Sequence, residues 1–254
     1  MSAKSGVLAV FDIDGTLCDT QGSDGFCFGR AVESVMGRPF AAQDWTTFEE
    51  PTGGAILRDL LADDPDAVGK EIAIKTEFLR LLEEQRRLCP SEFMPIPGAS
   101  AFIDRLRCGA ICEVAIATGC FDISASFKLR CCGLDLTGFP HATSSDTPRR
   151  QDIIRLAASR AGFALSSIVH FGDGPWDVKA TRAVGVPMIG LGRGYTKLHS
   201  LGVENVFRDY TDADSIISVL DTFRAPRFVA HPLSVSVPRK RTGTEGCGSS
   251  EVLG

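Results

Sequence analysis

Apolar positions along the chain follow two patterns, short runs rich in β-forming residues and longer segments with helical spacing. The short runs predict strands at Val7–Phe11, Cys112–Ala117, a weak one at Phe139–Thr143, Ile168–Phe171, Val186–Leu191 and Asn205–Phe207. Between and after them, helical spacing covers Ala99–Arg107, a segment ending near Cys132, Arg150–Ala161, Trp176–Val184, Lys197–Leu201 and Ala213–Phe223. Strands that alternate with helices predict an α/β fold, with a Rossmann-like parallel sheet covered by helices on both faces.

The segment after the first strand follows a different pattern. Residues 20–94 show helical spacing around 26–36, 55–61 and 72–88, with no convincing strand, and end in the proline-rich stretch Pro90–Pro97. We therefore predict an all-helical cap at 20–94, inserted into an α/β core of residues 1–19 and 95–224.

The last thirty residues differ again in composition. Residues 225–254 are rich in proline, glycine and serine and contain the basic run Arg239–Arg241. Such a composition predicts a disordered C-terminal tail, in which three basic residues are most simply solvated.

Composition limits the classes of partner. A net charge of −5 and a pI near 5.4 give no reason to expect nucleic acid or an anionic membrane as a partner. No apolar run approaches the ~20 residues that span a bilayer. The first residues lead directly into a strand, leaving no room for a signal peptide. Nine cysteines without a Cys-x-x-Cys pair favour the reducing cytoplasm.

Two carboxylates close the first strand. Asp12 and Asp14 stand two residues apart after the apolar run, and Gly15 and Thr16 follow. Unpaired acids at the end of a buried strand lose hydration without compensation, so a cation is expected beside them. Mg²⁺ is the simplest choice, because it prefers oxygen ligands and commonly shares them with substrate phosphate.

Three further polar groups follow later predicted strands. They are Thr118-Gly119, Arg149-Arg150 and the loop from Gly172 to Asp177. In a parallel sheet the carboxyl ends of the strands meet at one edge, so these groups and Asp12 can converge on one ligand. A nucleophile, a hydroxyl donor, a fixed cation and metal ligands are what phosphoryl transfer requires.

Between Val7 and Phe223 the sequence resembles the haloacid dehalogenase-like superfamily, in its phosphoglycolate phosphatase-like and β-phosphoglucomutase-like subgroup with an inserted helical cap. Two motifs carry the resemblance, Asp-x-Asp-Gly-Thr at Asp12–Thr16 and Gly-Asp-Gly-x-x-Asp-x-x-Ala at Gly172–Ala180. The usual Lys-Pro motif is replaced by Arg149 and Arg150, of which we favour Arg150 as the phosphate-binding cation.

The acids then receive distinct expected roles. Asp12 would be the nucleophile that forms an aspartyl phosphate, and Asp14 the general acid and then the base for water. Asp173 would complete the Mg²⁺ ligands with Asp12 and, as the resemblance implies, the backbone carbonyl of Asp14. Asp177 would orient them from behind, although it could also be only an acid in the first turn of a helix.

The phosphate would be bound by hydroxyl, backbone and guanidinium groups. Thr118 would donate to the phosphoryl oxygens and Arg150 would neutralise their charge. Both also have structural interpretations, as a strand-terminal cap and a solvated helix residue. The remaining predicted members of this phosphate site are Gly15, Thr16, Gly119 and Arg149.

The cap predicts how specificity arises. Thr52-Gly53-Gly54 is the cap loop expected to reach the site, unless it is a plain interhelical turn. The expected function is Mg²⁺-dependent hydrolysis of a small phosphorylated metabolite, of the phosphoglycolate or sugar-phosphate kind, by a monomer or homodimer. A phosphomutase of the same superfamily and a non-catalytic phosphate-binding regulatory protein are the alternatives.

Overall fold

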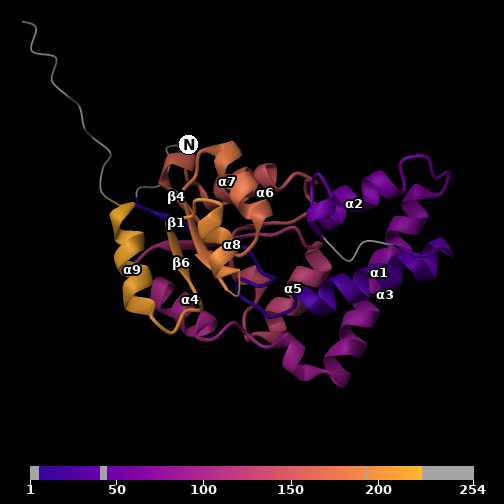
Figure 1. Cartoon of the computed structure of the whole chain (residues 1–254), viewed down its shortest axis with the longest axis horizontal. Helices are drawn as coiled ribbons and strands as arrows, with labels where there is room; N and C mark the ends of the chain where they lie inside the picture. The colour runs from indigo at the N-terminus through magenta and orange to yellow at the C-terminus, as the bar shows by residue number, and fades with distance from the viewer. Residues whose placement is uncertain (1–5, 41–44, 193, 225–254) are drawn as a thin grey trace, which may run out of the picture.

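A computed structural model describes residues 6–40, 45–192 and 194–224 of the chain. The predicted tail at 225–254 and the first five residues lie outside the described residues. Within the described part, six parallel strands form one sheet in the order β3-β2-β1-β4-β5-β6 (Figure 1). Their bounds are β1 Leu8–Phe11, β2 Glu113–Ala117, β3 His141–Ala142, β4 Ile168–Gly172, β5 Met188–Leu191 and β6 Asn205–Phe207.

Both faces of the sheet are covered, because alternate side chains of each strand point to opposite sides. Ala9 and Phe11 of β1 pack with α4, α5 and α9, whereas Leu8 and Val10 pack with α6 and α7. The α/β, Rossmann-like core predicted from the sequence is confirmed. The helices and short 3₁₀ turns of this part are α4 Ala99–Cys108, α5 Asp122–Cys131, η3 Leu136–Gly138, α6 Arg150–Ala161, η4 Leu165–Ser167, α7 Pro175–Val184, α8 Tyr195–Ser200 and α9 Ala213–Thr222.

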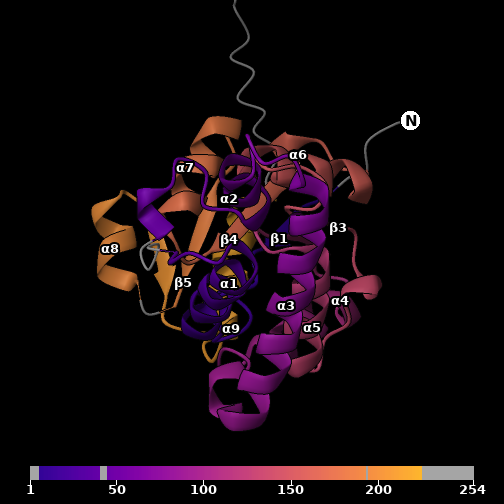
Figure 2. The ribbon, with the colours of Figure 1, turned by 90° about the vertical axis from the view of Figure 1, so that its right-hand side faces the viewer.

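The segment between β1 and α4 is helical throughout its described regular elements. These are α1 Gln21–Met36, η1 Trp45–Thr47, α2 Gly53–Leu60, α3 Ala67–Leu88 and η2 Pro90–Phe93. They enclose a hydrophobic cluster of their own, which Phe121 joins from the core. Figure 2, viewed from the side of these helices, shows β1, β4 and β5 behind them. The inserted helical cap is thus present, and its boundaries at 19/20 and 94/95 stay a prediction.

Two connecting segments run side by side between sheet and cap. The backbone N–H of Asp19 donates to the carbonyl of Met94 over 2.8 Å, and that of Ile96 donates to Leu17 over 2.9 Å. Cys18 forms a β-bridge with Pro95 between them. The cap is therefore attached through one narrow, hydrogen-bonded double connection.

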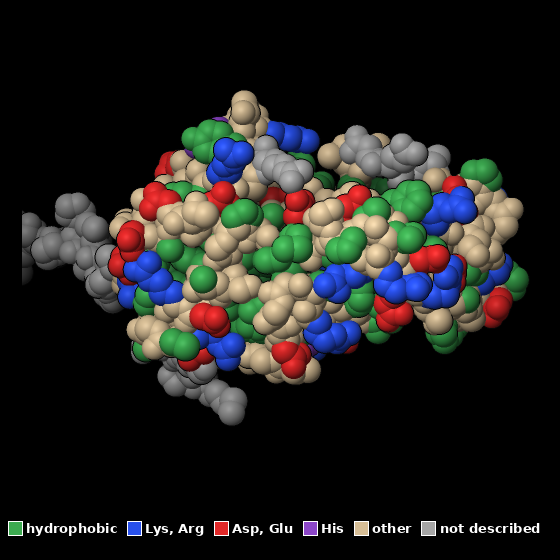
Figure 3. All heavy atoms as spheres, turned by 90° about the horizontal axis from the view of Figure 1, so that it is seen from below, with side chains coloured by type: hydrophobic (Ala, Val, Ile, Leu, Met, Phe, Trp, Pro, Cys, Tyr) green, Lys and Arg blue, Asp and Glu red, His purple; other side chains and the backbone are tan. Residues whose placement is uncertain are grey.

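The surface carries no single type of side chain on the face shown in Figure 3, where acidic, basic and apolar groups are intermixed. Among the described residues, no helix combines the length and apolar character that crossing a bilayer requires.

Candidate active site

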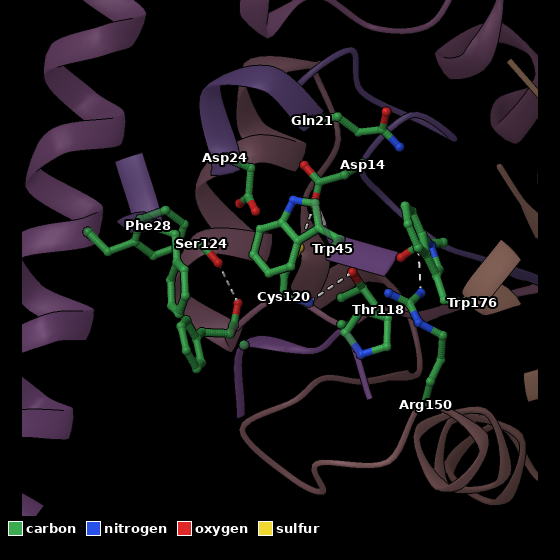
Figure 4. Close-up of a pocket in the computed structure, with 16 residues that line it drawn as sticks. Asp14, Gln21, Asp24, Phe28, Trp45, Thr118, Cys120, Ser124, Arg150 and Trp176 are labelled. Carbon is green, nitrogen blue, oxygen red and sulfur yellow. Dashed lines mark hydrogen bonds and ion pairs between the residues drawn. The ribbon is translucent and has the colours of Figure 1, made fainter. Parts of the chain in front are cut away.

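The functional side chains gather where the strands end. Asp12 follows β1, Thr118 follows β2 and Asp173 follows β4. Backbone hydrogen bonds fix the first two: the N–H of Asp12 donates to Phe171 over 3.0 Å and that of Thr118 to Ala142 over 3.2 Å. Asp12 and Thr118 line a cavity of about 120 Å³ between the sheet edge and the cap (Figure 4). The predicted convergence at this edge is therefore seen in the structure.

A buried arginine faces the first carboxylate. One terminal nitrogen of Arg150, Nη1, lies 3.2 Å from Oδ2 of Asp12 and 2.9 Å from Oδ1 of Asp177. Burial raises the pKa of Asp12, and the charge of Arg150 only partly opposes this. Arg150 is held in place at the wall of the cavity, and Trp176 lies beside its guanidinium.

Asp177 supports the site from behind. Its Oδ2 accepts hydrogen bonds from the backbone N–H groups of Asp173 (3.2 Å) and Gly174 (3.1 Å), and its Oδ1 contacts buried His170 at 3.3 Å. Burial opposes ionisation of Asp177, but Arg150 and His170 lower its pKa below the ordinary value. Asp177 thus fixes the acidic loop and Arg150 at once.

The carboxylates form a pocket suited to a divalent cation. Oxygens of Asp12, Asp173 and Asp177 lie within 4.8 Å of one another. Oδ1 of Asp12 and Oδ1 of Asp173 are buried without a hydrogen-bond partner, whereas both oxygens of Asp177 are already bonded. Burial and the neighbouring carboxylates Asp177 and Asp12 raise the pKa of Asp173 well above its usual range. Two orphaned buried oxygens in an uncompensated acidic pocket fit a hard ion such as Mg²⁺.

Close packing around Asp173 explains two of the nearby residues. A Cβ on Gly15, which has φ +74°, would lie 2.1 Å from Oδ2 of Asp173. The side-chain amide of Gln21, the first residue of α1, donates to the same oxygen. Gly15 is therefore required by space and backbone conformation, and Gln21 brings the cap into contact with the predicted metal ligands.

A buried lysine that the sequence analysis missed holds Asp14. Nζ of Lys128 lies 2.7 Å from Oδ2 of Asp14 and also pairs with Asp24, and the Lys128 side chain is fully buried. Cys120 and Thr20 donate further hydrogen bonds to Asp14. Burial alone would raise the pKa of Asp14, but the charge of Lys128 and these hydrogen bonds lower it.

Lys128 also occupies a second group of side chains that could hold a metal ion. Oxygens of Asp14 and Asp24 and the sulfur of Cys120 lie close enough together to hold a metal ion. Here they surround the ammonium of Lys128, with Nζ 3.3 Å from the Cys120 sulfur. In the sequence, Lys128 stands three residues after Ala125 and seven after Phe121. This helical spacing, which places Lys128 on a buried face, is the signal that could have indicated its burial.

The structure separates the two arginines that the sequence left open. Arg149 is exposed at the N-cap of α6 and does not line the cavity, whereas Arg150 does. Gly119 lines the cavity beside it, and a Cβ there would lie 2.5 Å from Nη2 of Arg150. Thr16 is fully buried with Gly15 in the turn after β1, and neither lines the cavity.

The cap loop contacts the core directly. Thr52 caps α2, and its hydroxyl donates to the carbonyl of Pro148 over 2.6 Å. The N–H of Gly53 donates to the carbonyl of Gly119 over 2.9 Å. Cβ atoms on Gly53 and Gly54 would lie 2.7 Å from the Phe121 ring and 2.3 Å from the Ser144 carbonyl oxygen. The predicted cap loop is therefore the N-cap and first two residues of α2, which contact the core at the cavity and leave no space for side chains at Gly53 and Gly54 without movement.

The fold and this arrangement of acids define a class of protein. Residues 8–185 match the family model of the haloacid dehalogenase-like hydrolases, and the chain belongs to that family. The match includes every acid, hydroxyl and arginine placed at the sheet edge above.

Individual proteins that are similar to this chain share a modest fraction of its sequence. A phosphoglycolate phosphatase of Agrobacterium fabrum (strain C58) is 27% identical over 201 residues, which cover 78% of this chain and 85% of that protein. A hydrolase from Pseudomonas syringae has a TM-score of 0.66 at 19% identity, covering 85% of this chain and 99% of that one. CbbY from Rhodobacter sphaeroides, solved in complex with phosphate, has a TM-score of 0.63 at 18% identity, covering 80% and 94%. These solved structures share the fold.

Lys128 generates a prediction about stability. Lys128→Met should lower the free energy of unfolding by ~3–5 kcal/mol, because it leaves Asp14 and Asp24 buried without their cation. Lys70→Met, which removes a partly exposed pair with Asp64, should cost at most ~1 kcal/mol. Urea unfolding measures both changes. Adding Asp24→Asn to Lys128→Met should restore part of the loss, and equal losses in the two single variants would contradict the role of Lys128.

Proposed function

We propose that the chain is a Mg²⁺-dependent phosphatase that hydrolyses a small phosphomonoester through an aspartyl phosphate. The observation that carries the proposal is the unpaired Oδ1 of Asp12 and of Asp173 at the sheet edge, with Arg150 fixed against Asp12. The similarity to a phosphoglycolate phosphatase supports this reaction class.

In the first step, Asp12 attacks phosphorus and the bond to the leaving oxygen breaks. Thr118 and Arg150 bind the phosphoryl oxygens, and Gly119 leaves room for the guanidinium. Asp14 enters this step protonated, against the pKa-lowering effect of Lys128, and donates that proton to the leaving oxygen as it departs. In the second step, Asp14 removes a proton from water, which attacks the phosphoryl group and releases Asp12.

Asp12, Asp173 and the backbone carbonyl of Asp14 would hold Mg²⁺, and the ion would neutralise negative charge between nucleophile and phosphate. Asp177 keeps the loop of Asp173 in place through its two backbone hydrogen bonds. The location in the cytoplasm and the state as monomer or homodimer stay predictions.

Two alternatives use the same residues differently. A phosphomutase would return the phosphoryl group to the substrate, so isomerised phosphosugar would form without phosphate release. A regulatory phosphate-binding protein would show no turnover. The joint presence of Asp12 and Asp14 near the cavity favours hydrolysis over mere binding, because binding has no need of a proton donor.

The metal requirement can be measured directly. Excess EDTA should abolish phosphate release from 4-nitrophenyl phosphate, and Mg²⁺ should restore it. Ca²⁺ should not, because its larger and looser ligand shell misplaces the nucleophile. Mg²⁺ should also raise the unfolding temperature of the wild type but not of Asp173→Asn. Full turnover in EDTA would refute the metal requirement.

Adjacent arginines provide a matched test of phosphate binding. Arg150→Ala should lower kcat/KM by at least ~10²-fold, because the buried cation facing the phosphoryl group is lost. Arg149→Ala removes the same side chain from the exposed N-cap position and should change kcat/KM by less than about twofold. Steady-state kinetics and circular dichroism spectra compare the pair. A larger loss in Arg149→Ala would reverse the assignment.

The two aspartates differ in the step that they control. Asp12→Asn removes the nucleophile, so activity should fall below detection. Asp14→Asn should still form a phosphoenzyme with 4-nitrophenyl phosphate, whose leaving group needs no proton, but lacks the base for water. General acid–base catalysis typically raises the rate of a step by ~10²–10⁴-fold, so hydrolysis of the phosphoenzyme should be slow in Asp14→Asn.

Rapid mixing of Asp14→Asn should therefore show a stoichiometric burst of nitrophenol, followed by slow turnover. Mass spectrometry should locate one added phosphoryl group at Asp12. Turnover by Asp12→Asn without a burst in Asp14→Asn would show that the roles are assigned wrongly.

A further inference from the structure

The part of the cavity away from Arg150 is lined by aromatic rings. Phe28 and Phe78 come from the cap and Phe121 from the core, and all three are almost fully buried. The ring centroid of Phe28 lies 5.7 Å from that of Phe78, 6.2 Å from that of Phe121 and 5.8 Å from that of half-buried Trp45. In the view of Figure 4 the Trp45 ring lies between Phe28 on one side and Trp176 with Arg150 on the other. A leaving group bound here would lie among flat apolar surfaces.

Positive charge is confined to the other end. Among the described residues that line the cavity, Arg150 is the sole lysine or arginine, and it faces Asp12 and Asp177. Lys75 lies nearby, but its Nζ pairs with Glu71 and sits over the Phe121 ring, 4.8 Å from the centroid. The described lining therefore offers no free cation for a second anionic group of a substrate.

The charged groups beside the rings are acidic. Asp14 and Asp24 line the cavity, and one buried cation, Lys128, serves both of them. The hydroxyl of Ser124 is engaged with the carbonyl of Phe121. A carboxylate or second phosphate on the leaving group would lose its hydration among rings and meet two acids. The chemistry of the lining thus disfavours phosphoglycolate and sugar bisphosphates.

We propose that the physiological substrate is a phosphomonoester of a small, uncharged aromatic alcohol, bound with its ring against Phe28, Phe78, Phe121 and Trp45. The inference rests on the proposed phosphatase function and narrows its substrate class. The proposed substrate class differs from the phosphoglycolate or sugar phosphate that the sequence predicted.

The experiment compares phosphate release from three phosphate esters and one acyl phosphate with the purified full-length chain and Mg²⁺. Benzyl phosphate and 4-carboxybenzyl phosphate share the reacting atoms and differ by one negative charge. Phosphoglycolate is the small anionic competitor. Acetyl phosphate, which has almost no leaving group to bind, reports the core chemistry alone.

The wild type should show a kcat/KM for benzyl phosphate at least about tenfold above those for 4-carboxybenzyl phosphate and phosphoglycolate, in line with the burial of one ring. A higher kcat/KM for phosphoglycolate or 4-carboxybenzyl phosphate than for benzyl phosphate would overturn the aromatic assignment while leaving the phosphatase intact. A failure to hydrolyse acetyl phosphate and all three esters would instead refute the proposed function.

A charge placed in the cavity tests the same point from the protein side. Trp45→Arg should shift the ratio of kcat/KM for 4-carboxybenzyl over benzyl phosphate at least tenfold toward the carboxylated ester. Phe26→Arg adds the same charge on exposed α1 surface, where Phe26 is 60% accessible, and should leave the ratio unchanged. An equal shift in both variants, or none in Trp45→Arg, would overturn the placement of the ring beside Trp45.

Discussion

Repulsion among buried carboxylates is the constraint on which this site depends. Asp12, Asp173 and Asp177 crowd one end of the sheet edge, and Arg150 supplies one positive charge among them. Nearby, Asp14 and Asp24 share the ammonium of Lys128. Three acids thus surround Arg150 and two surround Lys128. Charge of this kind is costly to bury, and the cation that we propose for this site would offset part of that cost.

The parallel sheet and the insert both contribute to the arrangement of these charges. The sheet brings residues from distant parts of the sequence to one edge, because every strand ends there. The insert contacts the core at this edge through Gln21 on Asp173, Gly53 on Gly119 and Asp24 on Lys128, among other contacts. Beneath these contacts Asp12 and Asp177 are almost fully buried, and burial strengthens the charge interactions that they make. The cap therefore contributes to the electrostatics of the site as well as to its shape.

The sequence predicted the sheet and its edge because both follow local rules. Apolar runs mark the strands, and the acids that follow β1 and β4 are adjacent to those runs. Lys128 could not be assigned this way, because its partner Asp14 lies 114 residues earlier and helical position alone cannot reveal a buried ion pair. The sequence also could not show which of Arg149 and Arg150 faces the cavity, because that depends on where α6 begins and how it is oriented. Gly192, which follows β5, packs closely against the turn after β1, since a Cβ there would lie 2.9 Å from the Gly15 carbonyl oxygen.

The pairing of Asp24 with Lys128 also has a mechanical consequence. Asp24 is carried by α1 of the insert and Lys128 by α5 of the sheet domain, so the ion pair works as a latch between two bodies joined by a narrow hinge. Swinging the insert outward pulls one buried charge away from the other and strands Lys128 with Asp14 alone. Because the latch is shielded from solvent, dissolved salt weakens it little. The ammonium that holds Asp14 in place thus also ties the insert to the sheet domain.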